Sequence, residues 1–292
     1  MQARKRIQWQ GYLCLTPLAI MVCIFLLYPL LNGVYTSFFT TKYGFGDMAF
    51  AGFRNYINIF KEEKFPFAIR NSIIWVLASI LLNSVIPVGI ALLLNREFRG
   101  KPFVIGALLI PWMTPVVGFG MMNKWFLEPD VGVLNRVLQD IGILSQGINF
   151  LGRTDLALPV LILLNFWQTS SFGILMISSA LSTIPEEQYD AMKVDGANFM
   201  QTLKNLVMPS IGFMVGFMLF LGTVQTFNNY ALIFLLTKGG PSNATYTIPV
   251  MIYEKAFNEF NIGQSTALAS IVGIILIALG IRFFRGMSKE QT

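Results

Sequence analysis

Residues 156–185 read LALPVLILLNFWQTSSFGILMISSALSTIP, and this stretch contains no Lys, Arg, Asp or Glu. A helix of about 20 apolar residues is long enough to cross the hydrocarbon core of a bilayer. Because lipid offers the backbone no hydrogen-bond partner, such a segment must close its hydrogen bonds internally, as a helix does. The stretch therefore predicts a membrane-spanning helix.

Five further charge-free runs flank this one, at residues 11–41, 71–95, 102–123, 205–237 and 260–281. All charged residues of the 292-residue chain lie between the runs, and only 12% of residues are charged while 54% are hydrophobic. A large soluble helical protein is the alternative, but helices in soluble proteins average about 12 residues. The sequence thus predicts an all-α integral membrane protein with six transmembrane helices.

Lys and Arg are about twice as dense in every second connecting segment, and such segments face the cytoplasm. The denser segments are residues 1–10, 96–101, 186–204 and 282–292, and the sparser ones are 42–70, 124–155 and 238–259. Both termini are therefore predicted to be cytoplasmic. The predicted divisions are a tail (1–10), a first span (11–41), a periplasmic loop (42–70), a core with five spans (71–285) and a second tail (286–292).

The first run has an alternative interpretation, because Arg4-Lys5-Arg6 precede it like the basic region of a secretory signal peptide. The run is longer than the apolar region of about 7–15 residues in such peptides. It also lacks a small-residue cleavage site followed by polar sequence. We therefore expect a retained membrane span.

Several activities lack the residues that they need. The chain has no His, and its two cysteines, Cys14 and Cys23, lie nine positions apart on one predicted helix, so neither a metal site nor a disulfide is expected. No catalytic residues are predicted, and no G-x-x-x-x-G-K-[ST] phosphate loop is present. No predicted span carries an ionisable group of the kind that proton-coupled carriers use. The net charge of +6 is assigned to membrane anchoring and not to nucleic acid.

Uncharged polar and aromatic residues gather in two of the predicted spans, and we name these as the candidate solute path: Asn165, Trp167, Gln168, Gln225, Asn228, Asn229 and Tyr230. On regular helices Asn165 and Gln168 share a face, and so do Gln225, Asn228 and Asn229. Amides facing lipid are costly, so both faces are expected to turn inward. They serve either as interhelical hydrogen-bond partners or as the wall of a cavity for a hydroxyl-rich solute, and both interpretations remain open here.

The segment at residues 185–209, called the elbow below, carries helix signals. Thr183 and Glu186 have capping-box spacing, and Pro185 lies in the first turn. Gly196 then interrupts the helix, which resumes toward the fifth span. The pattern predicts two short helices joined at a glycine and exposed at the cytoplasmic surface. Such an elbow either docks into a soluble partner or is an ordinary solvated connector.

The elbow resembles the EAA motif of the inner-membrane permeases of binding-protein-dependent ABC importers. The matching positions are Asp190, Ala191, Met192, Gly196, Leu206, Met208 and Pro209. Their spacing agrees throughout, with Asp for Glu, Met for Ala, Leu for Ile and Met for Leu. Three outer stretches (50–56, 125–135 and 237–247) resemble the carbohydrate branch of that family, which includes maltose-type and glycerol-phosphate-type permeases.

The resemblance implies a type I importer permease in a bacterial inner membrane. Its partners would be a second permease subunit of different sequence, a dimer of ATP-binding subunits that hold ATP and Mg²⁺, and an extracytoplasmic solute-binding protein. This chain would bind no cofactor and hydrolyse nothing. The contact with the ATPase would involve Glu187, Asp190, Ala191, Asp195 and Gly196. The implied cargo is a sugar or a related polyhydroxylated solute; the alternative is a secondary carrier or channel that needs no ATPase.

Overall fold

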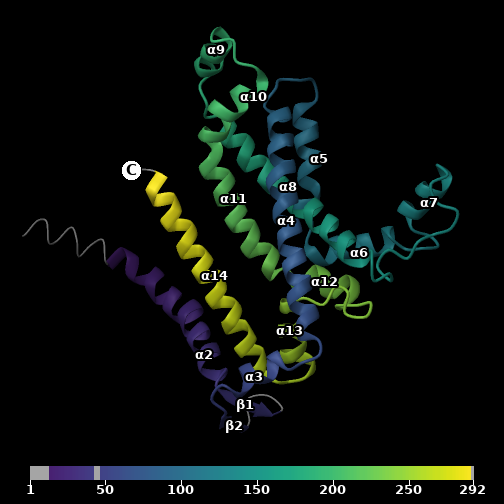
Figure 1. Cartoon of the computed structure of the whole chain (residues 1–292), viewed down its shortest axis with the longest axis vertical. Coiled ribbons are helices and arrows are strands. Elements are labelled where there is room, and N and C mark those ends of the chain that lie inside the picture. Colours follow the sequence, from purple (N-terminus) through teal and green to yellow (C-terminus); the bar gives the residue numbers. More distant parts are fainter. Residues whose placement is uncertain (1–12, 43–46, 291–292) are drawn as a thin grey trace, which may run out of the picture. The chain divides into compact units, whose positions relative to one another are not determined.

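The computed structural model describes residues 13–42 and 47–290. The chain forms two compact units (Figure 1). Unit 1 contains Met1–Phe65 and Met251–Ile277, and unit 2 contains Pro66–Val250 and Ala278–Thr292. The predicted N-terminal tail, with Arg4-Lys5-Arg6, lies outside the described residues.

Within the described residues, five helices are individually long and apolar enough to span a membrane: Leu13–Thr36, Phe65–Leu94, Ala157–Leu181, Phe199–Thr237 and Ile262–Gly286. They correspond to five of the six charge-free runs. The remaining run, 102–123, forms two helices, α5 (Lys101–Met113) and α6 (Val116–Phe126), which meet at 99°. Counted as one span, this bent pair completes the six predicted spans. Thr114 precedes Pro115 and is extended, with ψ 126°, because a proline disfavours the helical conformation in the residue before it.

In unit 1, the first helix includes the π-helical turn η1 (Cys23–Leu27) and α2 (Tyr28–Thr36). The helix ends before the charge-free run does, because the strand β1 (Phe39–Lys42) pairs antiparallel with β2 (Asp47–Phe50). The unit also contains the short helix α3 (Arg54–Phe60) and the π-helical turn η3 (Glu254–Asn258). The helices α13 (Ile248–Tyr253) and α14 (Ile262–Glu290) each lie partly in this unit.

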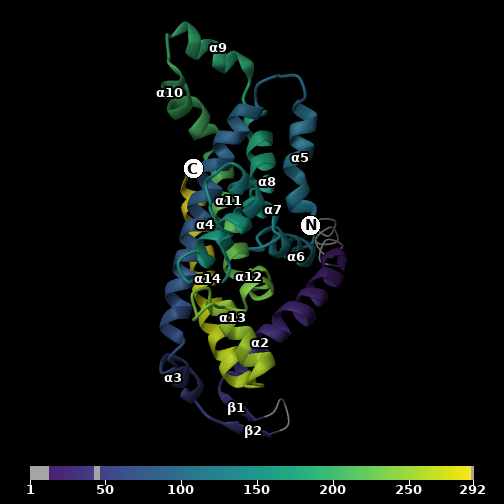
Figure 2. The same cartoon turned by 90° about the vertical axis from the view of Figure 1, so that its right-hand side faces the viewer.

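The long helix α8 (Ala157–Leu181) forms the centre of unit 2. Half of its most apolar window is buried, against 17% for α4 (Phe65–Leu94) and 11% for the fifth span. Both α5 and α11 (Met208–Asn228) pack against α8, and α4 runs alongside them (Figures 1 and 2). A buried apolar cluster closes one end of this bundle: Ala91, Ile177, Leu181, Ile184, Val207 and Ile211.

The remaining helices of unit 2 are short, with four to nine residues each. The elbow contributes α9 (Glu186–Val194), α10 (Phe199–Thr202) and the π-helical turn η2 (Leu203–Val207). The opposite side contributes α7 (Val133–Asp140) and α12 (Tyr230–Thr237). The elbow and the connection between α4 and α5 lie at one end of unit 2, with α12 toward the other (Figures 1 and 2). This arrangement agrees with the predicted alternation of the connecting segments.

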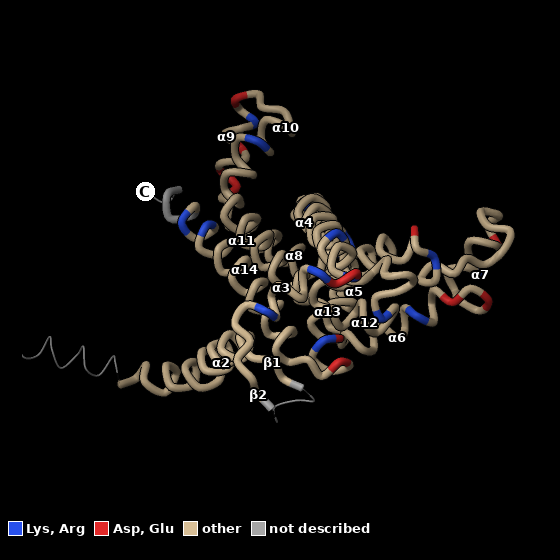
Figure 3. Tube along the Cα trace, turned by 60° about the horizontal axis from the view of Figure 1, so that its bottom comes forward, with Lys and Arg blue, Asp and Glu red and all other residues tan. Residues whose placement is uncertain are grey.

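Charged side chains lie mainly on the connections and at the ends of the long helices, whose middle sections are uncharged (Figure 3). This distribution suits helices surrounded by lipid, since a charge in the hydrocarbon core is costly. The last helix, α14, continues to Glu290, so the segment 286–292 that was expected to be a tail begins inside a helix. In unit 2, Phe283 of this helix stacks on Phe220 with ring centroids 4.8 Å apart.

Buried polar side chains form hydrogen bonds to the backbone in the three outer stretches that resemble carbohydrate permeases: Asn55, Asn135 and Thr245. Asn55 donates from Nδ2 to the carbonyls of Ser37 and Phe39, each at 2.8 Å. Asn135 is buried and accepts the backbone N–H of Ile148 at 2.8 Å. In the third stretch a threonine does the same work, because Thr245 donates to the carbonyl of Gly240 at 2.7 Å. Asn55 therefore ties its stretch to the end of the first helix and to β1, whereas Thr245 bonds within its own loop.

Candidate functional site

The helix α9 begins at Glu186, with Pro185 as its N-cap residue. The predicted capping box is wrong: Thr183 donates to the carbonyl of Ala180 at 2.8 Å, because it still belongs to the turn that ends α8. Glu186 and Glu187 do occupy the first turn, where their charges favour the positive end of the helix dipole. The start of the elbow is thus set by Pro185 and two acidic residues.

Gly196 ends α9 in a Schellman motif, as the sequence predicts. Its φ is +74°, a conformation that glycine adopts without strain. Its N–H donates to the carbonyl of Lys193 at 3.0 Å, and the N–H of Ala197 donates to the carbonyl of Met192 at 2.9 Å. These two bonds satisfy carbonyls that the helix end leaves open. The backbone at Gly196 therefore fixes the direction of the chain between the two elbow helices.

A true capping box begins α10. Asn198 accepts the N–H of Gln201 at 2.9 Å, and the side chain of Gln201 accepts the N–H of Asn198 at 2.8 Å. The turn η2 then continues into α11 without an interruption. The second half of the elbow is consequently one continuous helical path into the fifth span.

The five predicted coupling residues, Glu187, Asp190, Ala191, Asp195 and Gly196, are all exposed. Asp190 pairs with Lys193 at 2.8 Å, and this hydrogen bond raises the pKa of the Lys193 ammonium. Three exposed apolar side chains accompany them, with exposed fractions of 87% for Val194, 64% for Phe199 and 63% for Met200. The predicted ATPase contact does not include these three residues, although apolar residues in a polar, exposed segment often indicate a binding surface.

Tyr189 anchors the elbow to the bundle. Its ring packs against the buried apolar cluster, and burial raises the pKa of its phenol. Its hydroxyl is buried and has no hydrogen-bond partner among the described residues. The side of the elbow that faces away from the bundle thus carries both polar and apolar exposed side chains. On its other side, Tyr189 packs against α4 and α8.

The structure brings together only two of the candidate path residues. Asn165 is fully buried on α8; its Nδ2 donates to Ser79 Oγ at 3.4 Å, and its Oδ1 accepts from Asn229 Nδ2 at 2.9 Å. This pair serves as interhelical hydrogen-bond glue, the structural interpretation left open above. Ser79 was missed, although a polar residue in an apolar run marks an inward-facing position.

The fifth span is broken between α11 and α12, at Asn229. This residue has φ −79° and ψ 73°, which no helix allows, and its side chain accepts the N–H of Leu232 at 3.5 Å. At the break the carbonyl of Thr226 accepts the Trp75 indole N–H at 2.8 Å. The expectation that Asn229 shares a helix face with Gln225 and Asn228 is therefore wrong, because the helix ends before it.

The other path residues lie apart from this buried pair. Gln225, Asn228, Tyr230 and Trp167 are exposed, whereas Gln168 is half-buried and donates to the carbonyl of Thr114, at the α5–α6 bend, at 3.4 Å. Gln225 lines a small cavity of about 40 Å³ together with Asn83, Thr169 and Gly222. The expectation that both amide faces turn inward therefore holds for Asn165 but not for the exposed Gln225 and Asn228.

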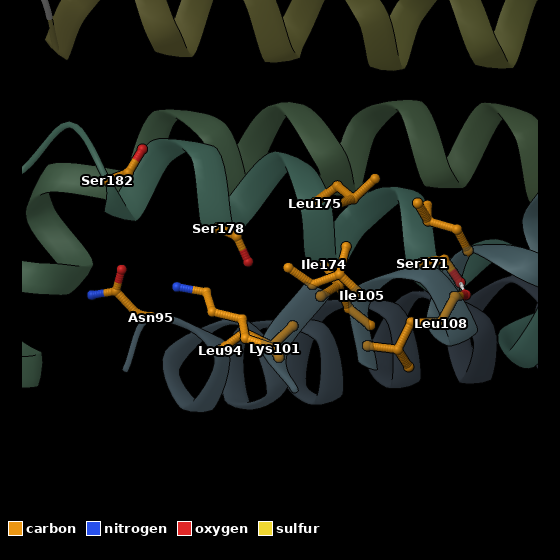
Figure 4. Close-up of a pocket in the computed structure, with 11 residues that line it drawn as sticks. Leu94, Asn95, Lys101, Ile105, Leu108, Ser171, Ile174, Leu175, Ser178 and Ser182 are labelled. Atoms are coloured by element: carbon orange, nitrogen blue, oxygen red, sulfur yellow. Dashed lines mark hydrogen bonds between the residues drawn. The ribbon is translucent and has the colours of Figure 1, made fainter. Parts of the chain in front are cut away.

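A second cavity, of about 110 Å³, lies between the end of α4, α5 and α8 (Figure 4). The side chains of Lys101 and Ser178 point into it. Ligand sites usually measure about 300–1,000 Å³, so this space is too small for a sugar. Among the residues that the structure describes, no group of His, Cys, Asp and Glu side chains is placed to hold a metal ion.

Comparisons with known proteins place this geometry in context. Residues 85–288 match the family described as binding-protein-dependent transport system inner membrane component. The chain is 31% identical to the sulfoquinovosyl glycerol transport system permease protein SmoG of Agrobacterium fabrum, over 89% of this chain and 84% of that protein. It is 26% identical to the trehalose/maltose transport system permease protein MalF of Thermococcus litoralis, over 94% and 90%.

The fold has also been seen before. A crystal structure of a bacterial ABC transporter involved in the import of the acidic polysaccharide alginate contains a chain that superposes with a TM-score of 0.85. The superposition covers 100% of both chains at 23% sequence identity. This likeness establishes the permease fold of the six predicted runs, including the bent pair.

Proposed function

The chain belongs to the family of binding-protein-dependent transport system inner membrane components, and on this premise we propose that it is the transmembrane subunit of an importer for a sugar or a related polyhydroxylated solute. In this proposal it works in a bacterial inner membrane beside a second permease of different sequence. An extracytoplasmic binding protein delivers the solute, and a separate pair of ATP-binding subunits hydrolyses ATP. The chain itself catalyses no reaction.

The elbow is the observation that carries the proposal. Its outer surface combines the exposed acids Glu187, Asp190 and Asp195 with the exposed apolar side chains of Val194 and Phe199. Burying such apolar groups in a cleft of a soluble partner supplies affinity, and the acids supply orientation. Its two helix ends are capped by hydrogen bonds within the elbow, so that it docks as a preformed element.

The connectivity supports a mechanical role for this docking. The elbow continues through η2 into α11, and α11 ends at the break beside Asn229. Closure of the ATP-binding subunits would displace the elbow and, through α11, the segment that contains the exposed amides. Such rigid-body motion of packed helices is a recognised form of alternating access.

The exposed path residues fit the proposed cargo. The amides of Gln225 and Asn228 offer donors and acceptors to hydroxyl groups, and the rings of Trp167 and Tyr230 offer flat apolar faces to a sugar. The relatives named for sulfoquinovosyl glycerol and for trehalose and maltose support a glycoside or sugar as the solute.

Reconstituted transport tests the proposal. We reconstitute this chain, the second permease and the ATP-binding subunits in proteoliposomes. Uptake of the solute that the cognate binding protein delivers is expected only when ATP is present on the side of the membrane that carries the ATP-binding subunits. Asp190→Lys is expected to abolish uptake without changing membrane insertion, whereas Asp155→Lys, at an equally exposed carboxylate outside the elbow, leaves uptake unchanged. Uptake by vesicles that hold this chain alone would contradict the proposal.

A further inference from the structure

An open groove of about 1210 Å³ separates the end of α4 from the elbow. Its walls are apolar side chains of α4, α8 and the elbow, among them Val85, Ile90, Leu93, Phe199 and Leu203. Its volume is about eleven times that of the 110 Å³ cavity of Figure 4, and it lies entirely within unit 2. No residue of the proposed solute path lines it, and of the residues assigned to the ATPase contact only Phe199 does.

The α4 residues that line the groove change from apolar to polar along the chain. From Val85 to Leu93 its α4 side is apolar, and at Asn95 and Arg96 it becomes polar. The nine-residue helical step from Val85 to Leu94, the end of α4, measures about 14 Å at 1.5 Å per residue. Half of the hydrocarbon core of a bilayer is about 15 Å thick. The apolar part of the groove therefore has the length of the acyl region of one leaflet.

The polar mouth of the groove favours an anion. Arg96 and Lys193 both line it, and Glu186 is the acidic residue among the lining side chains. Lys193 already pairs with Asp190, but Arg96 is exposed and has no ion-pair partner among the described residues. Tyr189 also lines the groove, but its hydroxyl is buried and does not belong to the mouth. A neutral apolar occupant would leave Arg96 unmatched.

We infer that the groove binds one anionic phospholipid of the cytoplasmic leaflet, with its acyl chains along α4 and its phosphate beside Arg96. The cytoplasmic leaflet is the anionic one, and each Lys or Arg near such a surface strengthens attraction by about fivefold. The lipid contacts α4 on one side and Phe199 and Leu203 of the elbow on the other. Its binding therefore depends on the position of the elbow, and anionic lipid adjusts the coupling between the elbow and the bundle.

Photo-crosslinking tests this site in the complete transporter, reconstituted in nanodiscs. Phosphatidylglycerol and phosphatidylcholine probes with a photoreactive acyl chain are compared, and labelled peptides from 85–96 and 199–207 are quantified. Arg96→Gln removes the charge at the mouth. Gly89→Leu fills the apolar part, since a Cβ at Gly89 meets nothing within 4 Å. The matched controls are Arg99→Gln and Gly106→Leu, at positions outside the groove lining.

We expect phosphatidylglycerol to label these peptides several-fold more than phosphatidylcholine in the unaltered chain. Arg96→Gln should reduce phosphatidylglycerol labelling by about fivefold, Gly89→Leu should reduce labelling by both probes, and the controls should change neither. Excess unlabelled phosphatidylglycerol should compete, which keeps the test independent of any variant. Equal labelling by both probes, no response to Gly89→Leu, or cross-links from the groove to another subunit in place of lipid would each overturn the inference.

Discussion

Asn229 donates from Nδ2 to Oδ1 of Asn165 at 2.9 Å, and this single bond joins the break in the fifth span to the most buried helix of unit 2. Asn165 uses its own Nδ2 toward Ser79 on α4, so one asparagine connects three spans. Away from water, an amide without a partner is costly. The position of the break is therefore fixed by side chains that lie far from it in sequence.

A double-mutant cycle measures this bond. Asn165→Ala and Asn229→Ala are each expected to lower the free energy of unfolding in detergent, with a coupling energy between them of about 0.6–1.7 kcal/mol. The coupling arises because either substitution removes the same hydrogen bond. Asn228→Ala serves as the control, since Asn228 is exposed and bonds only within its own helix, to the carbonyl of Val224. Strictly additive effects of the two substitutions would show that the bond is absent.

Trp75→Phe tests the other hydrogen bond at the break. The substitution keeps an aromatic ring in a buried site but removes the indole N–H that donates to the carbonyl of Thr226. We expect a loss of about 0.5–1.5 kcal/mol in the free energy of unfolding, the usual net value of one such bond. Hydrogen exchange should also rise in residues 226–232. Exchange that rises elsewhere but not in this segment would argue against a role for Trp75 at the break.

Gly196→Val tests whether the elbow depends on a backbone conformation. Nothing lies within 4 Å of a Cβ at Gly196, so the expected cost, about 1–2 kcal/mol, comes from its positive φ alone. ATP-coupled uptake should fall while insertion stays normal, and Gly196→Asn, which tolerates this conformation, should retain most of it. Gly100→Val is the matched control, because Gly100 has φ +88° and equally open space outside the elbow. A similar loss of coupling in Gly100→Val would remove the special role of Gly196.

The ion-pair cluster around Lys255 in unit 1 predicts a dependence on alkaline pH. Burial by itself lowers the pKa of the Lys255 ammonium, but hydrogen bonds to Glu259 and Glu62 outweigh it, so that this pKa is raised. The cluster therefore contributes its full stability below about pH 10.4, the ordinary value for lysine. That contribution is lost as the pH rises through the higher pKa of the folded state.

Thermal unfolding in detergent checks this prediction. The melting temperature of the unaltered chain should stay constant from pH 7 to 9 and fall progressively above about pH 10.5. Lys255→Met should be less stable by about 1.5–3 kcal/mol at pH 7, because two partly exposed carboxylates lose their charged hydrogen-bond donor, and should lack the alkaline step. The control is Lys64→Met: its pair with Glu254 is partly exposed, so a change of about 0–1 kcal/mol is expected. Equal effects of the two substitutions would contradict the assignment.

Sequence signals that act within a few residues predicted correctly where the first helix of the elbow ends. Gly196 ends α9 because the αL conformation at a helix end is a property of glycine itself. The predicted capping box at Thr183 is wrong for an equally local reason. An N-cap residue must lie outside the preceding helix, whereas the Thr183 hydroxyl still donates to the carbonyl of Ala180. Spacing alone does not tell whether a preceding helix has ended.

The two breaks in the spans show a different limit. Pro115 carries a local signal for the α5–α6 bend, since it restricts the residue before it. Prolines also occur inside continuous helices of this chain, however, as Pro87 does in α4. The break at Asn229 has no local signal of comparable strength. It depends on Trp75, which lies 151 positions from Thr226, and on Asn165.

The sequence alone determined which segments lie in lipid and which in water, where the elbow lies, and how Gly196 turns it. These properties follow from the hydropathy of each segment and from the conformational preferences of single residues. Only the tertiary structure decided which amides bond to one another and which stay exposed. Helical periodicity gives the face of a residue on its own helix, whereas the partner across the bundle depends on how the helices pack.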